Sequence, residues 1–191
     1  METEEHPLGP FLPANARLLM LGSFPPPRAK WSMEFFYPNF INDMWRIFGL
    51  VFFGDRERFV AAGGKRFDRG AIEGFLRGRG IALYDAAKSV RRLNNNASDK
   101  FLEVAEPVCL EGLLSEIPHC SAVAATGQKA VDVVSMQLGV SAPPVGGFVG
   151  AETGGRRIEL WRMPSSSRAY PKPLSEKAEV YARMFAALGM L

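Results

Sequence analysis

A glycine–serine–phenylalanine turn followed by three prolines is the first group of residues whose types suggest chemistry. In the stretch Gly22-Ser23-Phe24-Pro25-Pro26-Pro27, the glycine permits a close backbone approach and the prolines fix the chain. Exposed N–H groups at such a turn could hold a carbonyl oxygen or an oxyanion, and the alternative is a rigid turn without a ligand. The GxGxxG and GK[ST] patterns are missing, so this is not a dinucleotide or Walker phosphate loop.

An aromatic segment with two asparagines follows at residues 31–45. Its rings could form a platform for a flat base, and the amides of Asn39 and Asn42 could hold a water molecule. The alternative is that both asparagines cap the helix that begins after them. The four closely spaced aromatic residues are Phe35, Phe36, Tyr37 and Phe40.

Two more polar groups follow apolar runs later in the chain. Asp85 could cap a helix or accept hydrogen bonds from a ligand, and the basic residues after it (Lys88, Arg91 and Arg92) could contact phosphates or form a solvated face. The stretch Pro164–Pro171 holds three consecutive serines, whose hydroxyls and backbone N–H groups could grip a phosphate. Its flanking prolines favour a fixed shape over a flexible loop.

Histidine and cysteine chemistry is poorly supported. The two histidines, His6 and His119, have no spacing that pairs them, and the two cysteines, Cys109 and Cys120, are too few for a four-cysteine metal site. We therefore expect neither a metal ion nor another cofactor.

Four short apolar runs, separated by helical patterns, must position these loops. The alternation predicts a three-layer α/β/α sandwich around a central, mainly parallel four-stranded sheet. Ligands of such sheets bind beyond the carboxyl ends of the strands, so the segments GSFPPP, DAAKS, TGQKA and PSSSRAYP should converge on one site. The predicted strands are Ala16–Gly22, Gly80–Asp85, Ser121–Thr126 and Arg157–Met163. The predicted helices are Asn42–Phe48, Asp55–Ala62, Asp68–Arg77, Pro107–Ile117, Gly127–Leu138 and Ser175–Leu188.

Length and composition are those of one globular domain. The chain has 191 residues, of which 47% are hydrophobic and 23% charged, and a formal net charge of +3 that permits a polyanionic partner without demanding one. We divide it into an N-terminal extension (residues 1–15) and a single domain (residues 16–191). No apolar run approaches the roughly 18–20 residues of a membrane span, and the acidic start is unlike a signal peptide. We expect a cytoplasmic monomer that contacts no membrane.

Taken in order, these stretches resemble the uracil-DNA glycosylase superfamily, most closely its hypoxanthine/mismatch-type branch. LMLGSFPP is similar to that branch's Gly-Ser-Phe/Met-Pro-Gly motif, and FYPNFINDMWRIFG to its tyrosine, proline, asparagine and tryptophan helix start. GIALYDAAKS is similar to its second strand and loop, TGQKA to its Asn-Gly-x-Lys-Ala segment, and MPSSSRAYP to its Leu-Pro-Ser-Thr-Ser-Pro-Ala loop. The resemblance runs from about Arg17 to the C-terminal helix.

The resemblance implies the same α/β/α fold and a metal-independent, monofunctional DNA glycosylase. Such an enzyme flips a deaminated or mismatched base, uracil or hypoxanthine above all, out of DNA and hydrolyses its N-glycosidic bond. In the related branch an asparagine before the tryptophan-bearing helix positions the water, and the spacing to Trp45 matches Asn42, with Asn39 as the rival. The implied substrate-binding residues are Gly22, Ser23, Phe24, Phe36, Tyr37, Phe40 and Asp85. The implied DNA-binding residues are Lys88, Ser165, Ser166, Ser167, Arg168 and Tyr170.

Four departures from the family's motifs leave the choice of base open. Pro26 replaces a glycine, Thr126 replaces an asparagine, Met163 stands where efficient uracil enzymes have histidine, and Asp85 stands where those enzymes place a base-reading asparagine. Two other functions stay open. One is a non-catalytic module that binds DNA or a nucleobase, and the other is an enzyme that acts on a free nucleoside or nucleotide.

Overall fold

A five-stranded sheet forms the centre of the molecule in a computed structural model that describes residues 3–93 and 101–191. The strand order is β3-β2-β6-β8-β7, and the first four strands run parallel. They are β2 (Leu18–Gly22), β3 (Ile81–Asp85), β6 (Ala122–Thr126) and β8 (Arg156–Met163). Every residue of β2, β3 and β6 is buried, as expected of parallel strands covered on both faces.

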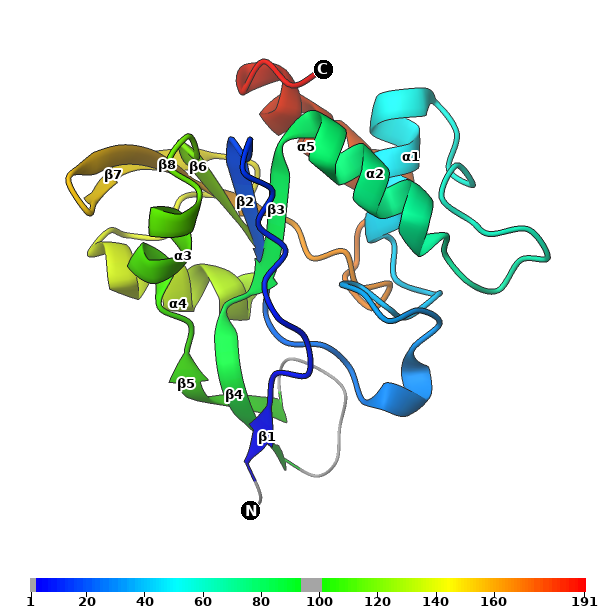
Figure 1. Ribbon diagram of the computed structural model, residues 1–191, viewed down its shortest axis with the longest axis horizontal. Coiled ribbons are helices and arrows are strands. Elements are labelled where there is room, and N and C mark those ends of the chain that lie inside the picture. Colours follow the sequence, from blue (N-terminus) through cyan, green and yellow to red (C-terminus); the bar gives the residue numbers. More distant parts are fainter. Residues whose placement is uncertain (1–2, 94–100) are drawn as a thin grey trace.

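Helices cover both faces of this sheet (Figure 1). Helices α3 (Leu110–Glu116) and α4 (Gln128–Leu138) lie on one face. On the other face lie α1 (Met44–Phe53), α2 (Arg69–Arg79) and α5 (Leu174–Ala187). A short 3₁₀ helix, Arg28–Lys30, follows the first loop. The three-layer α/β/α sandwich predicted from the sequence is therefore confirmed.

The sheet has five strands, so the predicted number of four was wrong. The fifth strand, β7 (Phe148–Thr153), pairs antiparallel with β8 at the edge of the sheet. Only one of its six residues is buried. An edge strand needs no continuous apolar run, and that is why the apolar pattern did not reveal it.

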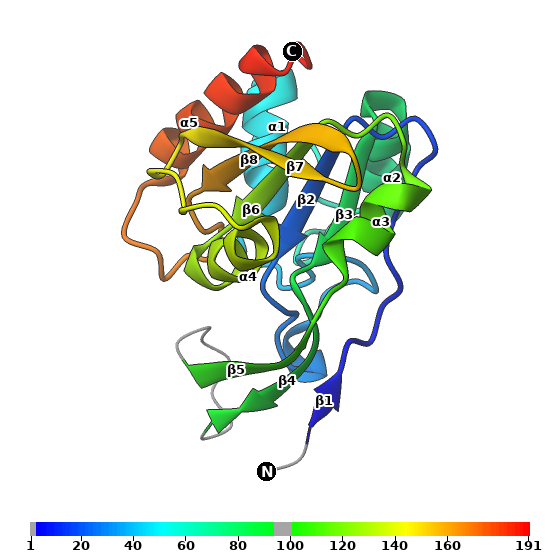
Figure 2. The same cartoon turned by 90° about the vertical axis from the view of Figure 1, so that its left-hand side faces the viewer.

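A second, small sheet extends beyond the carboxyl ends of the parallel strands (Figure 2). It has the order β1-β4-β5 and consists of β1 (Glu4–Glu5), β4 (Ala87–Arg92) and β5 (Leu102–Pro107). The segment after β3 was expected to be a loop, but after Ala86 it continues directly as β4. The small sheet forms its own apolar cluster around Phe24.

The N-terminal residues pack against the rest of the chain. Glu4 and Glu5 pair with Val90 and Ser89 of β4, and Phe11 forms an isolated bridge with Leu83 of β3. The segment that we separated as an extension is thus in contact with both sheets. Within the described residues, no helix is both long enough and apolar enough to span a membrane.

Candidate functional site

A cavity of about 760 Å³ lies at the carboxyl edge of the main sheet. Its size lies in the range of small-molecule sites. Its wall is formed by residues from the end of each parallel strand and by the aromatic segment between β2 and α1. The predicted convergence is therefore confirmed for three of the four segments, while the segment DAAKS contributes Asp85 alone and continues as β4. The contributions include Gly22–Pro26, Asp85, Thr126–Lys129, Ser165–Pro171 and residues 37–39, 41 and 42.

The first loop is held in place through its backbone carbonyls. The N–H of Ala86 donates to Gly22 at 2.8 Å, and the N–H of Ala87 donates to Ser23 at 3.3 Å. The guanidinium of Arg92 donates to the carbonyl of Pro25 at 2.5 Å and binds Glu4. With these carbonyls engaged, the loop keeps a fixed shape at the cavity wall.

Tyr37 reaches across the cavity from a strained backbone position. Its φ of 50° lies in the left-handed region, which non-glycine residues seldom adopt and which is often found at functional sites. The Tyr37 hydroxyl lies 3.0 Å from the Thr126 hydroxyl, which itself lies 3.3 Å from the carbonyl of Leu21. Because Leu21 can only accept, Thr126 donates to it and Tyr37 donates to Thr126. This chain of hydrogen bonds joins the aromatic segment to β6 and β2.

Both candidate asparagines line the cavity, and both also make a local turn. Asn42 Oδ1 accepts from the N–H of Met44 at 2.9 Å, at the start of α1. Asn39 Oδ1 accepts from the N–H of Ile41 at 3.1 Å. The N-cap of α1 is Asp43, so neither asparagine caps the helix and that alternative was wrong. Each amide still has a second lone pair on its oxygen and two donors on its NH₂ group. Either side chain therefore keeps groups that can orient a water molecule.

Buried charges fix the turn that carries Asn42. The guanidinium of Arg46 donates to the carbonyl of Phe40 at 2.7 Å and to that of Asn42 at 3.3 Å. Its burial lowers the pKa of Arg46 from its ordinary value. The carboxylate of Asp43, the residue after Asn42, accepts a hydrogen bond from the buried ammonium of Lys177 at 2.9 Å. Arg168 lies 3.6 Å from the other oxygen of Asp43.

The serine loop is tied to the same turn. The carbonyl of Ser166 accepts from the N–H of Asp43 at 2.9 Å, and the carbonyl of Ser167 accepts from Lys177 at 2.7 Å. The hydroxyl of Ser165 accepts from the N–H of Ser167 at 3.2 Å, and that of Ser167 accepts from the N–H of Ala169 at 3.3 Å. These two N–H groups are therefore engaged within the loop, and the serine hydroxyl protons are its candidate donors to a phosphate.

Asp85 places a buried carboxylate in the cavity wall, with only 6% of the residue exposed. Its partner is a residue that the sequence did not indicate: His6 Nε2 lies 2.8 Å from Asp85 Oδ2. The neighbouring Tyr84 is also buried, and this burial raises the pKa of the Tyr84 phenol. Asp85 thus belongs to the site, as expected, but its environment depends on the N-terminal segment.

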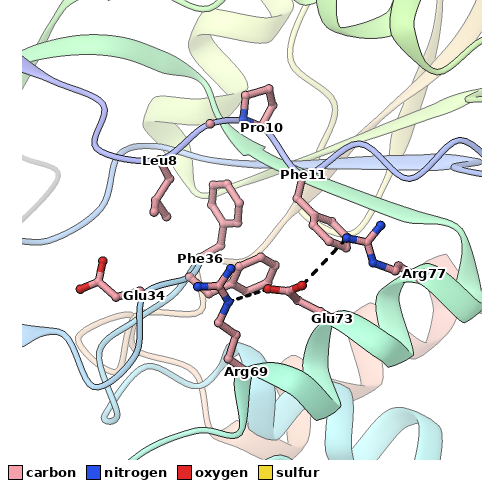
Figure 3. A pocket seen from close by; sticks show the side chains of 10 residues that line it. Leu8, Pro10, Phe11, Glu34, Phe36, Arg69, Glu73 and Arg77 are labelled. Carbon is pink, nitrogen blue, oxygen red and sulfur yellow. Dashed lines mark hydrogen bonds and ion pairs between the residues drawn. The ribbon is translucent and has the colours of Figure 1, made fainter.

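Phe36 and Phe40 lie elsewhere, and the cavity wall formed by the described residues does not include them. Phe36 is 3% exposed and packs in the main core, where it borders a smaller cavity under the N-terminal segment (Figure 3). Phe40 contacts the ring of Phe67 and the guanidinium of Arg46. We therefore do not assign base stacking to these two rings, although Tyr37 does line the main cavity.

The smaller cavity has about half the volume of the main one, about 380 Å³. Figure 3 shows Leu8, Pro10 and Phe11 on one side of it and residues of α2 on the other. Its charged side chains are already paired, since Arg69 and Arg77 lie near Glu73 and Glu34 binds Arg28 outside the cavity. We assign no ligand to it.

The basic residues that follow Asp85 are each paired with a glutamate on the small sheet. Lys88 donates to Glu106 at 2.8 Å, and this hydrogen bond raises the pKa of Lys88. Arg91 lies 3.8 Å from Glu103, and Arg92 pairs with Glu4. None of these three cations is among the described residues that line the cavity. The structure thus favours the solvated-face interpretation for Lys88 and Arg91, and for Arg92 a role in holding the first loop.

Among the residues that the structure describes, no three His, Cys, Asp or Glu side chains converge in a way that could hold a metal ion. Cys120 is buried, and burial raises the pKa of its thiol to about 11. A thiol with such a pKa is almost fully protonated near neutrality and is a poor nucleophile.

No protein-family model matches the chain, and no curated protein matches it. Twenty-one chains of solved structures do match. One of them is the solution NMR structure of a Methanosarcina acetivorans protein described as a "putative Uracil DNA glycosylase". The two chains are 21% identical and superpose with a TM-score of 0.63. The superposition covers 95% of this chain and 96% of the other. At that identity, the likeness shows that this chain shares the fold of that protein over nearly its whole length.

Proposed function

We propose that this protein is a DNA glycosylase of the uracil-DNA glycosylase superfamily. On this proposal it flips a deaminated or mismatched base, with uracil and hypoxanthine as the leading candidates, into the cavity and hydrolyses the N-glycosidic bond without a metal ion. One observation carries the proposal: the carboxyl-end regions of the four parallel strands meet in one cavity lined by Asn42, Asp85 and the serine loop. The shared fold with a protein described as such an enzyme supports it.

The reaction places different demands on the sugar and on the base. Cleavage of the N-glycosidic bond leaves an oxocarbenium-like sugar, while the bonding electron pair moves onto the departing base. Donors aimed at a carbonyl oxygen of the base stabilise the charge that develops there. The backbone N–H groups of Ser23 and Phe24 are our candidates, because their loop is fixed at the cavity wall.

The water that attacks C1′ must be held by a neutral amide in this proposal. Asn42 is the first candidate because it stands directly before Asp43, whose N–H binds the serine loop. A phosphate held by Ser165–Ser167 would therefore bring the sugar close to Asn42. An amide does not titrate, so Asn42 would contribute by orienting the water and by stabilising the transition state through the dipole of the amide.

The DNA partner would be held by the serine loop, with Arg168 or Tyr170 filling the space that the flipped base vacates. Both residues line the cavity, and Arg168 is largely exposed. We further propose that the protein acts as a monomer in the cytoplasm.

Base release by Asn42→Ala tests the proposal. We expect wild-type protein to release uracil or hypoxanthine from labelled oligonucleotides, and the variant to be slower by at least about tenfold because the water is no longer positioned. Asn39→Ala is the matched control, since it removes the same kind of hydrogen bond, from a side-chain oxygen to the N–H two residues on. It should retain most of the wild-type rate.

Wild-type rates in Asn42→Ala would contradict the assigned role. A large loss of base release in Asn39→Ala alone would assign the water-positioning role to Asn39 instead. DNA binding without release of any base would instead favour the non-catalytic binding module.

A further inference from the structure

The carboxylate of Asp85 is held by a histidine that lies 79 positions earlier in the chain. His6 Nε2 lies 2.8 Å from Asp85 Oδ2, and the two side chains are 1% and 9% exposed. An ionised carboxylate can only accept, so Nε2 is the donor. The other ring nitrogen, Nδ1, faces the backbone of Leu8, whose carbonyl lies at 2.8 Å and whose N–H lies at 3.1 Å.

The surroundings of His6 leave its ring little freedom. The centroids of Phe24 and Tyr84 lie 5.2 and 4.7 Å from that of the imidazole. The backbone N–H of His6 donates to the carbonyl of Lys88 at 2.8 Å, which continues the pairing of β1 with β4. His6 therefore engages Oδ2 of Asp85 and leaves Oδ1 as the oxygen that does not bind the imidazole.

The second oxygen of Asp85 lies against the first loop. A Cβ atom built on Gly22 would stand 2.3 Å from Asp85 Oδ1 and 3.3 Å from the Tyr37 hydroxyl. Any side chain at position 22 would displace the carboxylate, so only glycine allows this approach. A fixed acceptor, Oδ1, thus lies beside the loop that carries the Ser23 and Phe24 backbone N–H groups.

A fixed acceptor beside N–H donors is complementary to a lactam, which is a carbonyl next to a ring N–H. Uracil and hypoxanthine carry this group, and deamination creates its N–H. In cytosine and adenine the corresponding ring nitrogen carries a lone pair instead, which a carboxylate repels. Guanine and thymine also carry the lactam, so other parts of the cavity wall must distinguish these two bases from uracil and hypoxanthine.

We propose that Asp85 is the specificity-determining residue of the site and accepts the ring N–H of a lactam base, with His6 as the positioning residue that presents Oδ1. This inference rests on the proposed function and names its substrate class. It also gives a physical reason for an aspartate at a position where the resembled uracil enzymes carry an asparagine: an acceptor reads the ring N–H, while the loop donors hold the carbonyl.

The variant Asp85→Asn tests the proposal with almost no change of shape. Because His6 Nε2 donates, it would pair with the new amide oxygen and turn the NH₂ group toward the base. An acceptor would become a donor, and release of uracil and hypoxanthine should fall at least tenfold with the melting temperature nearly unchanged. In His6→Ala/Asp85→Asn, the amide can rotate to offer its oxygen, so part of the release should return.

A binding measurement separates this inference from catalysis. Ligand-detected NMR on the wild-type protein should show binding of free hypoxanthine and none of 1-methylhypoxanthine, which lacks the N–H, or of adenine. Asp85→Asn should abolish the hypoxanthine signal. His6→Gln, which keeps a donor near Asp85, should retain more of that signal than His6→Ala.

Several results would overturn the inference. They are equal binding of hypoxanthine and its 1-methyl derivative, unchanged release in Asp85→Asn, and no recovery in the double variant. If no oligonucleotide loses a base but hypoxanthine binding depends on Asp85, the proposed function fails and the inference stands. If neither release nor hypoxanthine binding is detected with wild-type protein, both fail.

Discussion

At the scale of single residues, the backbone and a few polar side chains form the site. The hydroxyl of Thr126 links β6 to β2 and to Tyr37, and the serine hydroxyls shape their own loop. Charged partners determine where Asn42 and Asp85 lie in the cavity: Arg46 and Lys177 hold the turn that carries Asn42, and His6 holds Asp85. The site therefore depends on local hydrogen bonds and on buried charges together.

Arg168 provides a prediction at this scale. Its guanidinium is 55% exposed beside Asp43, at the cavity wall. We expect Arg168→Ala to slow base release from duplex DNA by about tenfold, because unstacking a base costs a few kcal/mol and the vacated space is no longer filled. Release from single-stranded DNA, which has no opposite strand, should change much less.

Lys129 is a suitable comparison, since it also lines the cavity but would act on phosphates only. Lys129→Ala should weaken activity on both substrates to a similar extent. Equal losses on both substrates in Arg168→Ala would refute the space-filling role.

The sequence identified some of these residues and missed others for physical reasons. Gly22 and Asp85 end buried strands and the serines follow another strand. Because the carboxyl ends of parallel strands share one edge, their convergence could be predicted. Phe36 and Phe40 were misplaced because an aromatic-rich composition does not show which ring is buried. His6 and Lys177 were missed because each acts through a tertiary contact, 79 and 134 positions away along the chain.

At the scale of elements, α5 fastens the serine loop to the start of α1. Lys177 of α5 is fully buried and binds both the Asp43 carboxylate and the Ser167 carbonyl. Tyr181 of the same helix donates to the carbonyl of Pro164 at 2.9 Å, and its complete burial raises the pKa of its phenol well above the ordinary value. A single helix thus holds the serine loop at both Pro164 and Ser167.

Removing this ammonium should be costly. We expect Lys177→Met to lower the free energy of unfolding by about 3–5 kcal/mol, because it leaves the buried Asp43 carboxylate with only the more distant Arg168. Urea unfolding measures the loss. The double variant Lys177→Met/Asp43→Asn removes both buried charges and should recover most of the stability. A single variant as stable as wild type would show that the pair does not matter.

The elements that the apolar pattern revealed are those that bury a whole face. All four parallel strands were predicted within two residues of their ends. The predicted helix Asp55–Ala62 was wrong: this stretch forms turns, after Gly54 ends α1 in the left-handed conformation. The small sheet was missed because β4 and β5 are polar, half-exposed strands with little apolar signal.

At the scale of the whole molecule, the N-terminal segment completes the site. It pairs with the small sheet, bridges to β3 and brings His6 to Asp85. A chain that begins after residue 15 would lack this partner of Asp85. Composition alone could not show this, because an acidic, proline-rich start is also typical of an unpaired extension.

The charge of the molecule permits its proposed partner without identifying it. The formal net charge is +3, and three cations, Lys30, Lys129 and Arg168, line the cavity. Affinity for DNA should therefore fall as salt concentration rises. The proposal that DNA is the partner rests on the loops of the cavity, with charge as a supporting factor.

Base release by the wild-type protein tests the proposed glycosylase activity most directly. Labelled oligonucleotides, single- and double-stranded, would carry uracil, hypoxanthine, xanthine or a G·T mismatch, and alkali would cleave the abasic sites formed. We predict release of uracil or hypoxanthine, and no release of adenine or cytosine from matched control oligonucleotides. Failure to release any base, while salt-sensitive binding to DNA persists, would contradict the proposed activity.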